Sequence, residues 1–432
     1  MAGADISRRT FAGVGLGAVA ALGLAACSSS SGAGSKGPLK FWNMPWGTPE
    51  FAKVDQQITE AFKPKSGLPA ATYRSVQWSA FNQTFSTAVA SNTGPAVSSG
   101  GGTQAFQFAK QGKIAYADGL LDSWKSTGLY DDFLPGLLDT MKTAKGYVAV
   151  PYHVDLRILW YRKSLLQKAG VSVPTDWQSH LDACAALKKI GVYGFGLSGG
   201  ATGNAFQAFV GWMINNGGGI FDEEQKPNLV TPANIEALDY AQELIRKGYA
   251  DPRSNGYSTA NTQAQWKAGK FGMQVEAPGL ASQVGGTVGP DMAVGEPLTS
   301  PSGQKGALSF PNNIMMYTNT PSQKDSEAFM TYYYKSMTPL WTKNLGLGLP
   351  VLKSIAATPE FRADANLAKI ADAWQPVAKT WAAPGGAALF ANVALVDSTQ
   401  PMTIFGQNVI ALKPPKTVLQ TLQSSLEAGL KG

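Results

Sequence analysis

The first 27 residues constrain the fold more than any other feature, because they have the pattern of an export signal rather than of a folded domain. Ser7-Arg8-Arg9-Thr10-Phe11 matches the twin-arginine pattern, and a run without charges follows up to Leu24-Ala25-Ala26-Cys27. The run is too short and too rich in glycine to span a membrane as a stable helix. We therefore predict a cleaved twin-arginine lipoprotein signal peptide over residues 1–26, with a lipid such as palmitate on Cys27.

After export, the mature chain is long and contains one cysteine besides Cys27. Residues 28–37 are mostly Ser and Gly, so residues 27–37 are expected to form a flexible tether on the extracellular face of the cytoplasmic membrane. About 400 residues exceed what one hydrophobic core usually supports, which predicts two lobes. Cys184 falls on the apolar face of a predicted helix and has no partner once Cys27 carries a lipid. Stability must then come from a large core rather than from disulfides.

Charge and composition exclude several classes of partner. The formal charge of +7 falls to +6 when the signal peptide, with one Asp and two Arg, is removed. The lysines are scattered, whereas nucleic-acid binding needs a clustered basic face, so no nucleic-acid partner is expected. His153 and His180 show no metal-ligand spacing, and the sequence predicts neither a metal site nor a cofactor.

Strand and helix patterns alternate along the chain. An extended segment at 38–42 precedes Thr48-Pro49, which is typical of a helix start, and further extended segments at 71–76 and 95–98 each precede an amphipathic stretch. Such repeating units predict an α/β lobe with a mainly parallel sheet. The patterns predict further strands at 147–152, 158–161, 271–276 and 314–318, and further helices that start at Thr175-Asp176, Thr231-Pro232 and Ser322.

No motif in the chain predicts an enzyme. Gly196-Leu197-Ser198-Gly199-Gly200 matches the nucleophile elbow of hydrolases, but both histidines precede Ser198, so the required order of Ser, acid and His cannot occur. Asp222-Glu223-Glu224 lacks the glycine and the alternating oxygens of a calcium loop and is interpreted as a solvated turn.

Three tryptophans carry the positive signal. Trp42, Trp46 and Trp78 lie at the predicted C-terminal ends of strands or in the loops that follow, where open α/β sheets bind their ligands. An indole face suits the apolar face of a sugar ring, while neighbouring amides and carboxylates suit its hydroxyls. For Trp42 a place in the core is an equally good interpretation, because Phe41 adjoins it in the strand.

Five sets of short segments follow one another in a characteristic order and spacing. They are Leu39-Lys40-Phe41-Trp42, Val150-Pro151-Tyr152 with Trp160-Tyr161-Arg162-Lys163, Leu165-Leu166-Gln167-Lys168-Ala169-Gly170 with Pro174-Thr175-Asp176-Trp177, Ala268-Gly269-Lys270-Phe271-Gly272-Met273, and Leu349-Pro350-Val351 with Lys353-Ser354. In these segments the chain resembles the extracellular solute-binding proteins of ABC importers, in the group that includes maltose-type binding proteins. The resemblance covers roughly residues 38–430.

This resemblance implies an α/β, two-lobe periplasmic-binding-protein-like fold (type II) with a hinge of crossing segments near 148–153, 297–308 and 346–351. It places residues 38–150 with 309–348 in an N-terminal lobe and residues 151–308 with 349–432 in a C-terminal lobe. The implied function is capture of a sugar or oligosaccharide between the lobes and its delivery to the permease subunits, without catalysis. A monomer is expected.

The expected ligand contacts come from both lobes and from the hinge. Asp155 is expected to accept hydrogen bonds from sugar hydroxyls and Arg157 to donate them, or else the two form a structural ion pair across the hinge. Two alternatives stay open: a protein of the same fold that binds a charged solute such as a glycerophosphodiester or a polyamine, and an exported carbohydrate-active enzyme. The candidate ligand-binding residues are Trp42, Asn43, Trp46, Trp78, Tyr152, Asp155, Arg157, Trp212, Glu276, Asn312 and Trp381.

Overall fold

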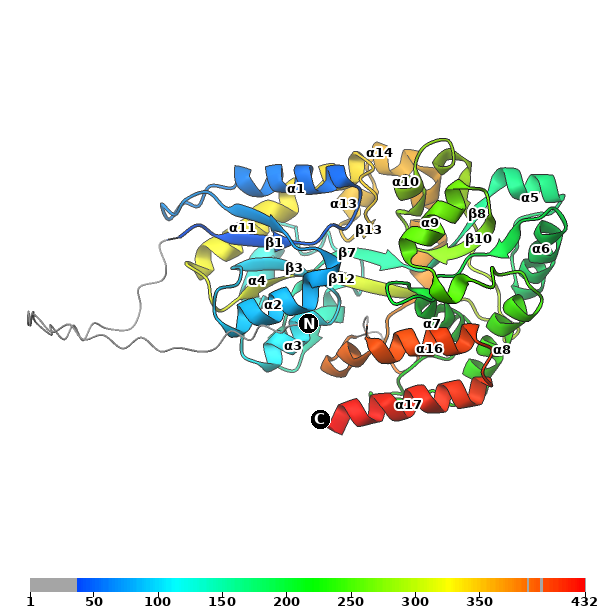
Figure 1. Ribbon diagram of the computed structural model, residues 1–432. Coiled ribbons are helices and arrows are strands. Elements are labelled where there is room, and N and C mark those ends of the chain that lie inside the picture. The colour runs from blue at the N-terminus through cyan, green and yellow to red at the C-terminus, as the bar shows by residue number, and fades with distance from the viewer. Residues whose placement is uncertain (1–36, 387, 397–398, 432) are drawn as a thin grey trace, which may run out of the picture. The chain divides into compact units, whose positions relative to one another are not determined.

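A computed structural model describes residues 37–386, 388–396 and 399–431 (Figure 1). The predicted signal peptide and the predicted lipid site at Cys27 lie outside these residues and stay predictions. Within the described ranges, no helix is long and apolar enough to cross a membrane.

The first sheet is mixed, so the prediction of a mainly parallel sheet holds only for β1, β2 and β3, and the crossing strands add antiparallel pairs. Strands run in the order β13-β7-β12-β3-β1-β2, with β4 and β14 also paired to β12. β1 pairs in parallel with both β2 and β3, while β12 runs antiparallel to β3 and β7. The strands are β1 Lys40–Asn43, β2 Thr72–Ser75, β3 Val97–Gly100, β4 Ile114–Ala115, β7 Val150–Leu156, β12 Ala307–Tyr317, β13 Leu349–Pro350 and β14 Ala378–Lys379.

Helices cover both faces of this sheet because side chains alternate along β1. Phe41 points to one face and contacts Tyr333 of α11, with ring centroids 5.1 Å apart. Trp42 points to the other face and contacts Phe85 of α2 at 5.5 Å. We call this sheet and its helices lobe 1. The helices are α1 Pro49–Ala61, α2 Phe81–Ala90, α3 Gln104–Lys110, α4 Asp118–Lys125, α11 Gln323–Ser336, α12 Pro339–Thr342 and α13 Lys353–Ala356.

The second sheet has the order β11-β8-β10-β9, and we call it and its helices lobe 2. Its strands are β8 Ile158–Arg162, β9 Tyr193–Phe195, β10 Phe271–Glu276 and β11 Met292–Val294. A third, two-stranded sheet pairs β5 Lys142–Thr143 with β6 Gly146–Tyr147. The lobe-2 helices are α5 Lys163–Ala169, α6 Trp177–Lys189, α7 Ala205–Asn215, α8 Pro232–Arg246, α9 Thr259–Lys267, α10 Leu280–Val284, α14 Pro359–Ala363, α15 Ala365–Lys369, α16 Gln400–Ile410 and α17 Pro415–Lys431.

Local signals in lobe 2 act as the sequence predicted. Asp176 caps α6, because its carboxylate accepts from the backbone N–H of Ser179 at 2.8 Å and the Ser179 hydroxyl accepts from the Asp176 N–H at 3.1 Å. The same helix buries Cys184 completely, which confirms the predicted core thiol. Burial raises the pKa of this thiol and keeps it unreactive.

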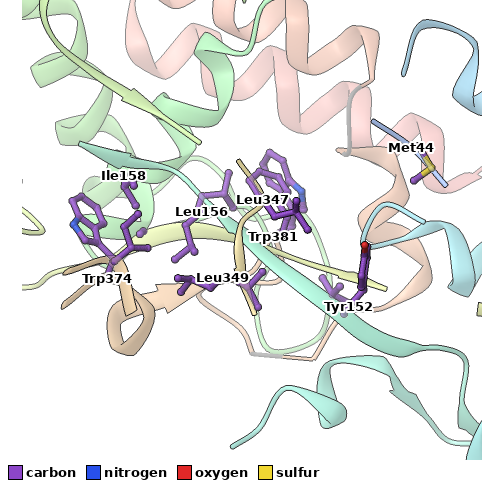
Figure 2. Packing of buried hydrophobic residues seen from close by; sticks show 14 of the residues in the cluster. Met44, Tyr152, Leu156, Ile158, Leu347, Leu349, Trp374 and Trp381 are labelled. Atoms are coloured by element: carbon purple, nitrogen blue, oxygen red, sulfur yellow. The ribbon is translucent and has the colours of Figure 1, made fainter. Parts of the chain in front are cut away.

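The lobes are joined by segments that leave one sheet and enter the other. β7 belongs to the first sheet and β8 to the second, and only Arg157 separates them. Along its length β7 pairs with β12 on one side and, at Val154 and His153, with β13 on the other. Figure 1 shows β7 and β12 side by side between the lobes, and Figure 2 shows apolar residues such as Tyr152 and Leu156 around them. The crossing segments confirm the predicted fold class.

Candidate functional site

Polar side chains alternate along β7 and share one face of the crossing ribbon. His153, Asp155 and Arg157 are two residues apart, so they project to the same side of the strand. In the antiparallel register Asn312 lies opposite His153 and Phe310 lies opposite Asp155, which adds both to this face. We call these five residues the hinge ribbon. The hinge ribbon is a mostly buried polar face between the lobes, and Asp155 is its most exposed member.

An aromatic group borders the ribbon on the lobe-1 side. The Trp46 ring meets the His153 ring edge-on at 4.4 Å and the Trp78 ring edge-on at 4.7 Å. Trp78 also contacts Phe81 at the start of α2, at 5.5 Å. Trp78 is 46 % exposed, which is unusual for an indole and leaves a ring surface available to a ligand.

A buried polar network fixes Trp46 in place. The Asn43 carbonyl oxygen accepts from the Trp46 indole N–H at 2.7 Å and also from the Ser99 hydroxyl at the end of β3. The Asn43 amide donates to the carboxylate of Asp55 in α1 at 2.6 Å. Burial raises the pKa of Asp55 to about 6, although hydrogen bonds from Tyr333 and Asn43 oppose the shift. Because Asn43 is fully buried, it affects the site indirectly, by holding Trp46 in place.

The same network explains where Tyr152 lies. Its hydroxyl is 2.9 Å from the hydroxyl of Tyr333, which in turn donates to Asp55. Tyr152 is completely buried on the face of β7 opposite to His153. A direct contact with ligand stays a prediction for Tyr152, and the geometry gives it a role in supporting the aromatic group.

The predicted pair of Asp155 and Arg157 forms an ion pair at 2.8 Å. The Arg157 guanidinium also donates to Gln207 of α7 at 2.6 Å and lies 4.6 Å from the centre of the Phe310 ring. Its side chain is 9 % exposed and that of Asp155 is 22 % exposed. Arg157 therefore braces the junction of the lobes, while Asp155 keeps a face open to solvent.

Lobe 2 contributes a cluster of amides around a buried carboxylate. Glu276, at the end of β10, accepts from the Asn204 amide at 2.9 Å and from the Gln274 amide at 3.3 Å. Burial raises the pKa of Glu276, and the nearby charge of Arg157 opposes this shift. Asn204 also accepts from the Ser198 hydroxyl at 2.6 Å. Ser198 is therefore part of a polar network at the N-terminus of α7, which accounts for the Gly-Leu-Ser-Gly-Gly loop without any hydrolase chemistry.

Trp381 lies against the ribbon from the C-terminal segment. Its ring meets Phe310 edge-on at 5.4 Å and is nearly parallel to Phe206 of α7 at 6.3 Å. The indole is 2 % exposed, whereas the composition of the flanking loop, Ala382-Ala383-Pro384-Gly385-Gly386, predicts an exposed ring. This part of the prediction is wrong, because the neighbouring Ala383 carbonyl accepts from the N–H groups of Ile220 and Phe221 and ties the loop to lobe 2.

Several buried polar atoms near the ribbon have no hydrogen-bond partner among the described residues. They include both ring nitrogens of His153, the indole nitrogen of Trp381, and the side-chain oxygens of Gln104 and Asn313. Buried polar atoms are normally paired, so unpaired ones in a binding region indicate groups that a bound ligand or water satisfies. The sequence analysis missed His153, Gln104, Asn313 and Asn204, although the alternation of His153 with Asp155 and Arg157 was a usable signal.

Two other predicted residues lie elsewhere, and a third is buried within the ribbon. Trp212 is buried among Phe195 and Tyr240 in the lobe-2 core, with ring centroids 5.1 Å away in both cases. Trp42 is 6 % exposed and lies under the Arg74 guanidinium, 4.4 Å from its ring centre, on the α2 face of lobe 1. Asn312 is buried in the ribbon itself. Ligand contacts of these residues stay predictions. Within the described ranges, no group of His, Cys, Asp and Glu side chains is arranged to hold a metal ion.

Two α/β lobes, joined by crossing strands that carry a polar and aromatic surface, define a solute-binding protein of the periplasmic-binding-protein type. The sequence comparison agrees, because the model of the family described as bacterial extracellular solute-binding protein matches residues 46–337. The chain belongs to this family.

Solved structures and curated sequences give the same class. The chain is similar to a sugar transporter from Arthrobacter chlorophenolicus A6 with bound laminaribiose, at 47 % identity, with 91 % of this chain and 99 % of that chain covered and a TM-score of 0.85. It is also similar to the GacH receptor of Streptomyces glaucescens, solved unliganded and with acarbose, at 25 % identity, 91 % and 98 % coverage and a TM-score of 0.73. A putative binding protein of Brucella abortus is 25 % identical over 343 residues, which cover 75 % of this chain and 81 % of that protein.

Proposed function

We propose that this protein is the substrate-binding lipoprotein of an ABC importer and that it binds a neutral sugar or oligosaccharide at the hinge ribbon. One observation carries the proposal: the exposed indole of Trp78 packs on Trp46, and Trp46 packs on the buried ring of His153. Neither nitrogen of the His153 ring has a hydrogen-bond partner among the described residues. The ring would contact the apolar face of a sugar, and the unpaired polar atoms would bind its hydroxyls. The solved relatives with laminaribiose and acarbose support the same ligand class.

The charges favour a neutral ligand over a charged one. Arg157 is the cation of the ribbon, and Asp155 neutralises it at 2.8 Å. Glu276 is buried, accepts from two amides and has a raised pKa, so its charge is either compensated within the protein or absent. A phosphodiester would need an unpaired cation and a polyamine an unpaired, accessible carboxylate. Sugar hydroxyls need neither.

Capture follows from a shift between conformations. A sugar that contacts Trp46 and Trp78 of lobe 1 and the Glu276 cluster of lobe 2 gains both sets of contacts only when the lobes approach. The ligand then favours the closed state by the free energy of those additional contacts. The permease would recognise the closed state and receive the sugar unchanged. We propose lobes at residues 38–150 with 309–348 and at residues 151–308 with 349–432, although β7, β13 and α13 continue lobe 1 past these boundaries.

The proposal includes the route and the attachment of the protein. The Arg8-Arg9 pair directs twin-arginine export, and a lipid on Cys27 holds the mature chain, as a monomer, at the extracellular face of the cytoplasmic membrane. Replacement of Cys27 by Ala should move the protein from the membrane fraction to the soluble fraction. Export of the variant is checked by adding protease outside the cells, which should degrade the exported protein. Membrane association that survives the replacement would contradict the anchor.

Titration calorimetry with the purified protein tests the ligand. The panel contains glucose and the glucose disaccharides laminaribiose, cellobiose and maltose, together with a glycerophosphodiester and spermidine. We expect saturable binding of a neutral sugar, with laminaribiose the first to test because of the solved relative. Binding of the phosphodiester or of spermidine, with silence for all sugars, would overturn the proposed ligand class, and hydrolysis of any disaccharide during the titration would overturn the binding-protein role.

A further inference from the structure

Lobe 1 has a second cavity that the sugar site does not use. It has a volume of about 580 Å³ and lies between helix α2 and the face of the edge strand β2. Its floor is built by alternate residues of two paired strands, because Lys40 is in register with Thr72 and Trp42 with Arg74. The wall is the outer side of α2 and the loop after it, with Gln83, Thr84, Thr87, Ala88 and Thr93.

The lining of this cavity is cationic. Lys40 and Arg74 are both exposed, and neither forms an ion pair with a described residue. None of the nine lining residues is acidic. The Arg74 guanidinium lies 4.4 Å from the centre of the Trp42 ring, which orients it before any ligand arrives. Two unpaired cations beside threonine hydroxyls suit an oxyanion such as a phosphate group.

The cavity runs beside strands β1 and β2, and none of its nine lining residues belongs to the hinge ribbon. Its floor extends from Lys40 and Thr72, at the end where the two strands begin, to Trp42 and Arg74. Lys113 is a further cation close to the rim, because its ammonium group donates to Asn92, the neighbour of the lining residue Thr93.

The chain enters lobe 1 at this same end. Lys40 is 13 residues after Cys27 (40 − 27), so even a fully extended connection reaches only about 45 Å. A lipid on Cys27 would therefore keep this basic end within reach of the membrane surface. Phospholipid headgroups are the phosphate source present there at high local concentration, and clustered Lys and Arg attract them.

We propose that the cavity between α2 and β2 binds the phosphate of an anionic phospholipid headgroup and seats lobe 1 on the membrane. The inference rests on the lipid anchor proposed above. Arg74 and Lys40 would hold the phosphate oxygens, and Lys113 would add attraction to the anionic surface.

Vesicle co-sedimentation tests this proposal without the anchor. Residues 35–432 form one compact unit, so this part can be used with no lipid attached. We expect binding to phosphatidylglycerol vesicles and not to phosphatidylcholine vesicles. The double variant Lys40→Gln with Arg74→Gln should lose about tenfold in apparent affinity. A matched control, Lys168→Gln with Lys189→Gln, removes two exposed lysines of lobe 2 and should stay within about twofold.

Each other outcome overturns the proposal. Equal losses in both double variants would show diffuse attraction rather than a site. Saturable binding of inorganic phosphate without vesicle binding would show a site for a free anion. Equal binding to phosphatidylglycerol and phosphatidylcholine vesicles would exclude the proposed contact with anionic headgroups. Sugar calorimetry on the same variants separates this result from the proposed function, because Lys40 and Arg74 lie outside the hinge ribbon and sugar affinity should not change.

Discussion

The amide of Asn43 donates to the carboxylate of Asp55 over 2.6 Å, and this bond joins the end of strand β1 to helix α1. Through the carbonyl oxygen of Asn43, the same link holds the indole of Trp46, 2.7 Å away. Asp55 is completely buried, and its hydrogen-bond partners Asn43 and Tyr333 are not members of the hinge ribbon. A carboxylate in the core of lobe 1 thereby helps to fix an aromatic ring of the proposed sugar site.

Replacement of Asp55 by Asn should change the pH dependence of stability. Burial raises the pKa of Asp55 from 3.8 to about 6, so the native state binds more protons than the unfolded chain between these pH values. The contribution of Asp55 to the free energy of unfolding is fully present below pH 4. This contribution, about 3 kcal/mol, is lost as the pH rises through 6. Urea unfolding at pH 4.5 and 7 measures this effect. The free energy of unfolding of the parent, relative to that of Asp55→Asn, should fall between pH 4.5 and pH 7.

Sugar affinity at neutral pH separates the bond from the charge of Asp55. The Asn side chain can still accept from Asn43, so affinity should stay within about threefold, whereas Asp55→Ala should lose about tenfold. Equal affinity in Asp55→Ala and the parent would show that Trp46 does not depend on this network.

His153 should make the protein sensitive to acid. Burial lowers its pKa to about 3, so the neutral ring stabilises the native state above pH 6.5, and this contribution is lost as the pH falls towards 3. His180 shifts in the same direction, and between pH 7 and pH 4.5 each histidine costs about 3 kcal/mol. Together they outweigh the opposite effect of Asp55, so the parent protein should be less stable at pH 4.5 than at pH 7.

His153→Phe should remove about half of this acid effect and keep stability at pH 7, because the replaced nitrogens have no partner. The matched variant His180→Phe should lose stability at pH 7, since the Tyr240 hydroxyl, 2.6 Å from the His180 ring, would be left unpaired. If the proposed site is right, His153→Phe also weakens sugar binding. Unfolding curves and calorimetry on the two variants measure both effects, and identical behaviour of the two would contradict the distinction.

Two tryptophans should separate ligand binding from stability. Trp78→Ala removes a half-exposed ring and should lower sugar affinity at least about tenfold, with a change in stability below about 1 kcal/mol. Trp212→Ala removes a ring buried in lobe 2 and should cost about 3–5 kcal/mol of stability. Calorimetry and thermal unfolding of both variants check the pair; loss of stability without loss of affinity in Trp78→Ala would exclude it from the site.

Arg157→Gln should weaken the junction of the lobes before any ligand is added. The guanidinium bonds to Asp155 and Gln207 and opposes the raised pKa of Glu276, so its loss leaves two carboxylates without their cation. Removal of one partner of a buried pair costs about 3–5 kcal/mol. Unfolding of the ligand-free variant measures this effect, and an unchanged melting temperature together with lost sugar binding would assign Arg157 to the ligand instead.

Local signals predicted several elements. Thr48-Pro49 starts α1, Asp176 caps α6, and the segment Phe271–Glu276 is a strand with the bounds that the pattern indicated. Trp46 was selected because an indole in a Pro-Gly loop lacks an obvious core to enter, and Trp78 because it follows a predicted strand beside Gln77 and Ser79. His153 was missed because its partners, Trp46 and Asn312, come from distant parts of the chain.

The sequence alone determined the class of fold, the three parallel strands β1, β2 and β3, the buried thiol and the aromatic signal, since periodicity, capping residues and composition act over short stretches of chain. Only the tertiary structure decided that Asn43 supports Trp46 rather than facing a ligand, that Trp212 and Tyr152 belong to the cores, and that Trp381 is covered. These roles depend on which distant segment fills the space beside each side chain, and that choice is made by packing across the whole fold.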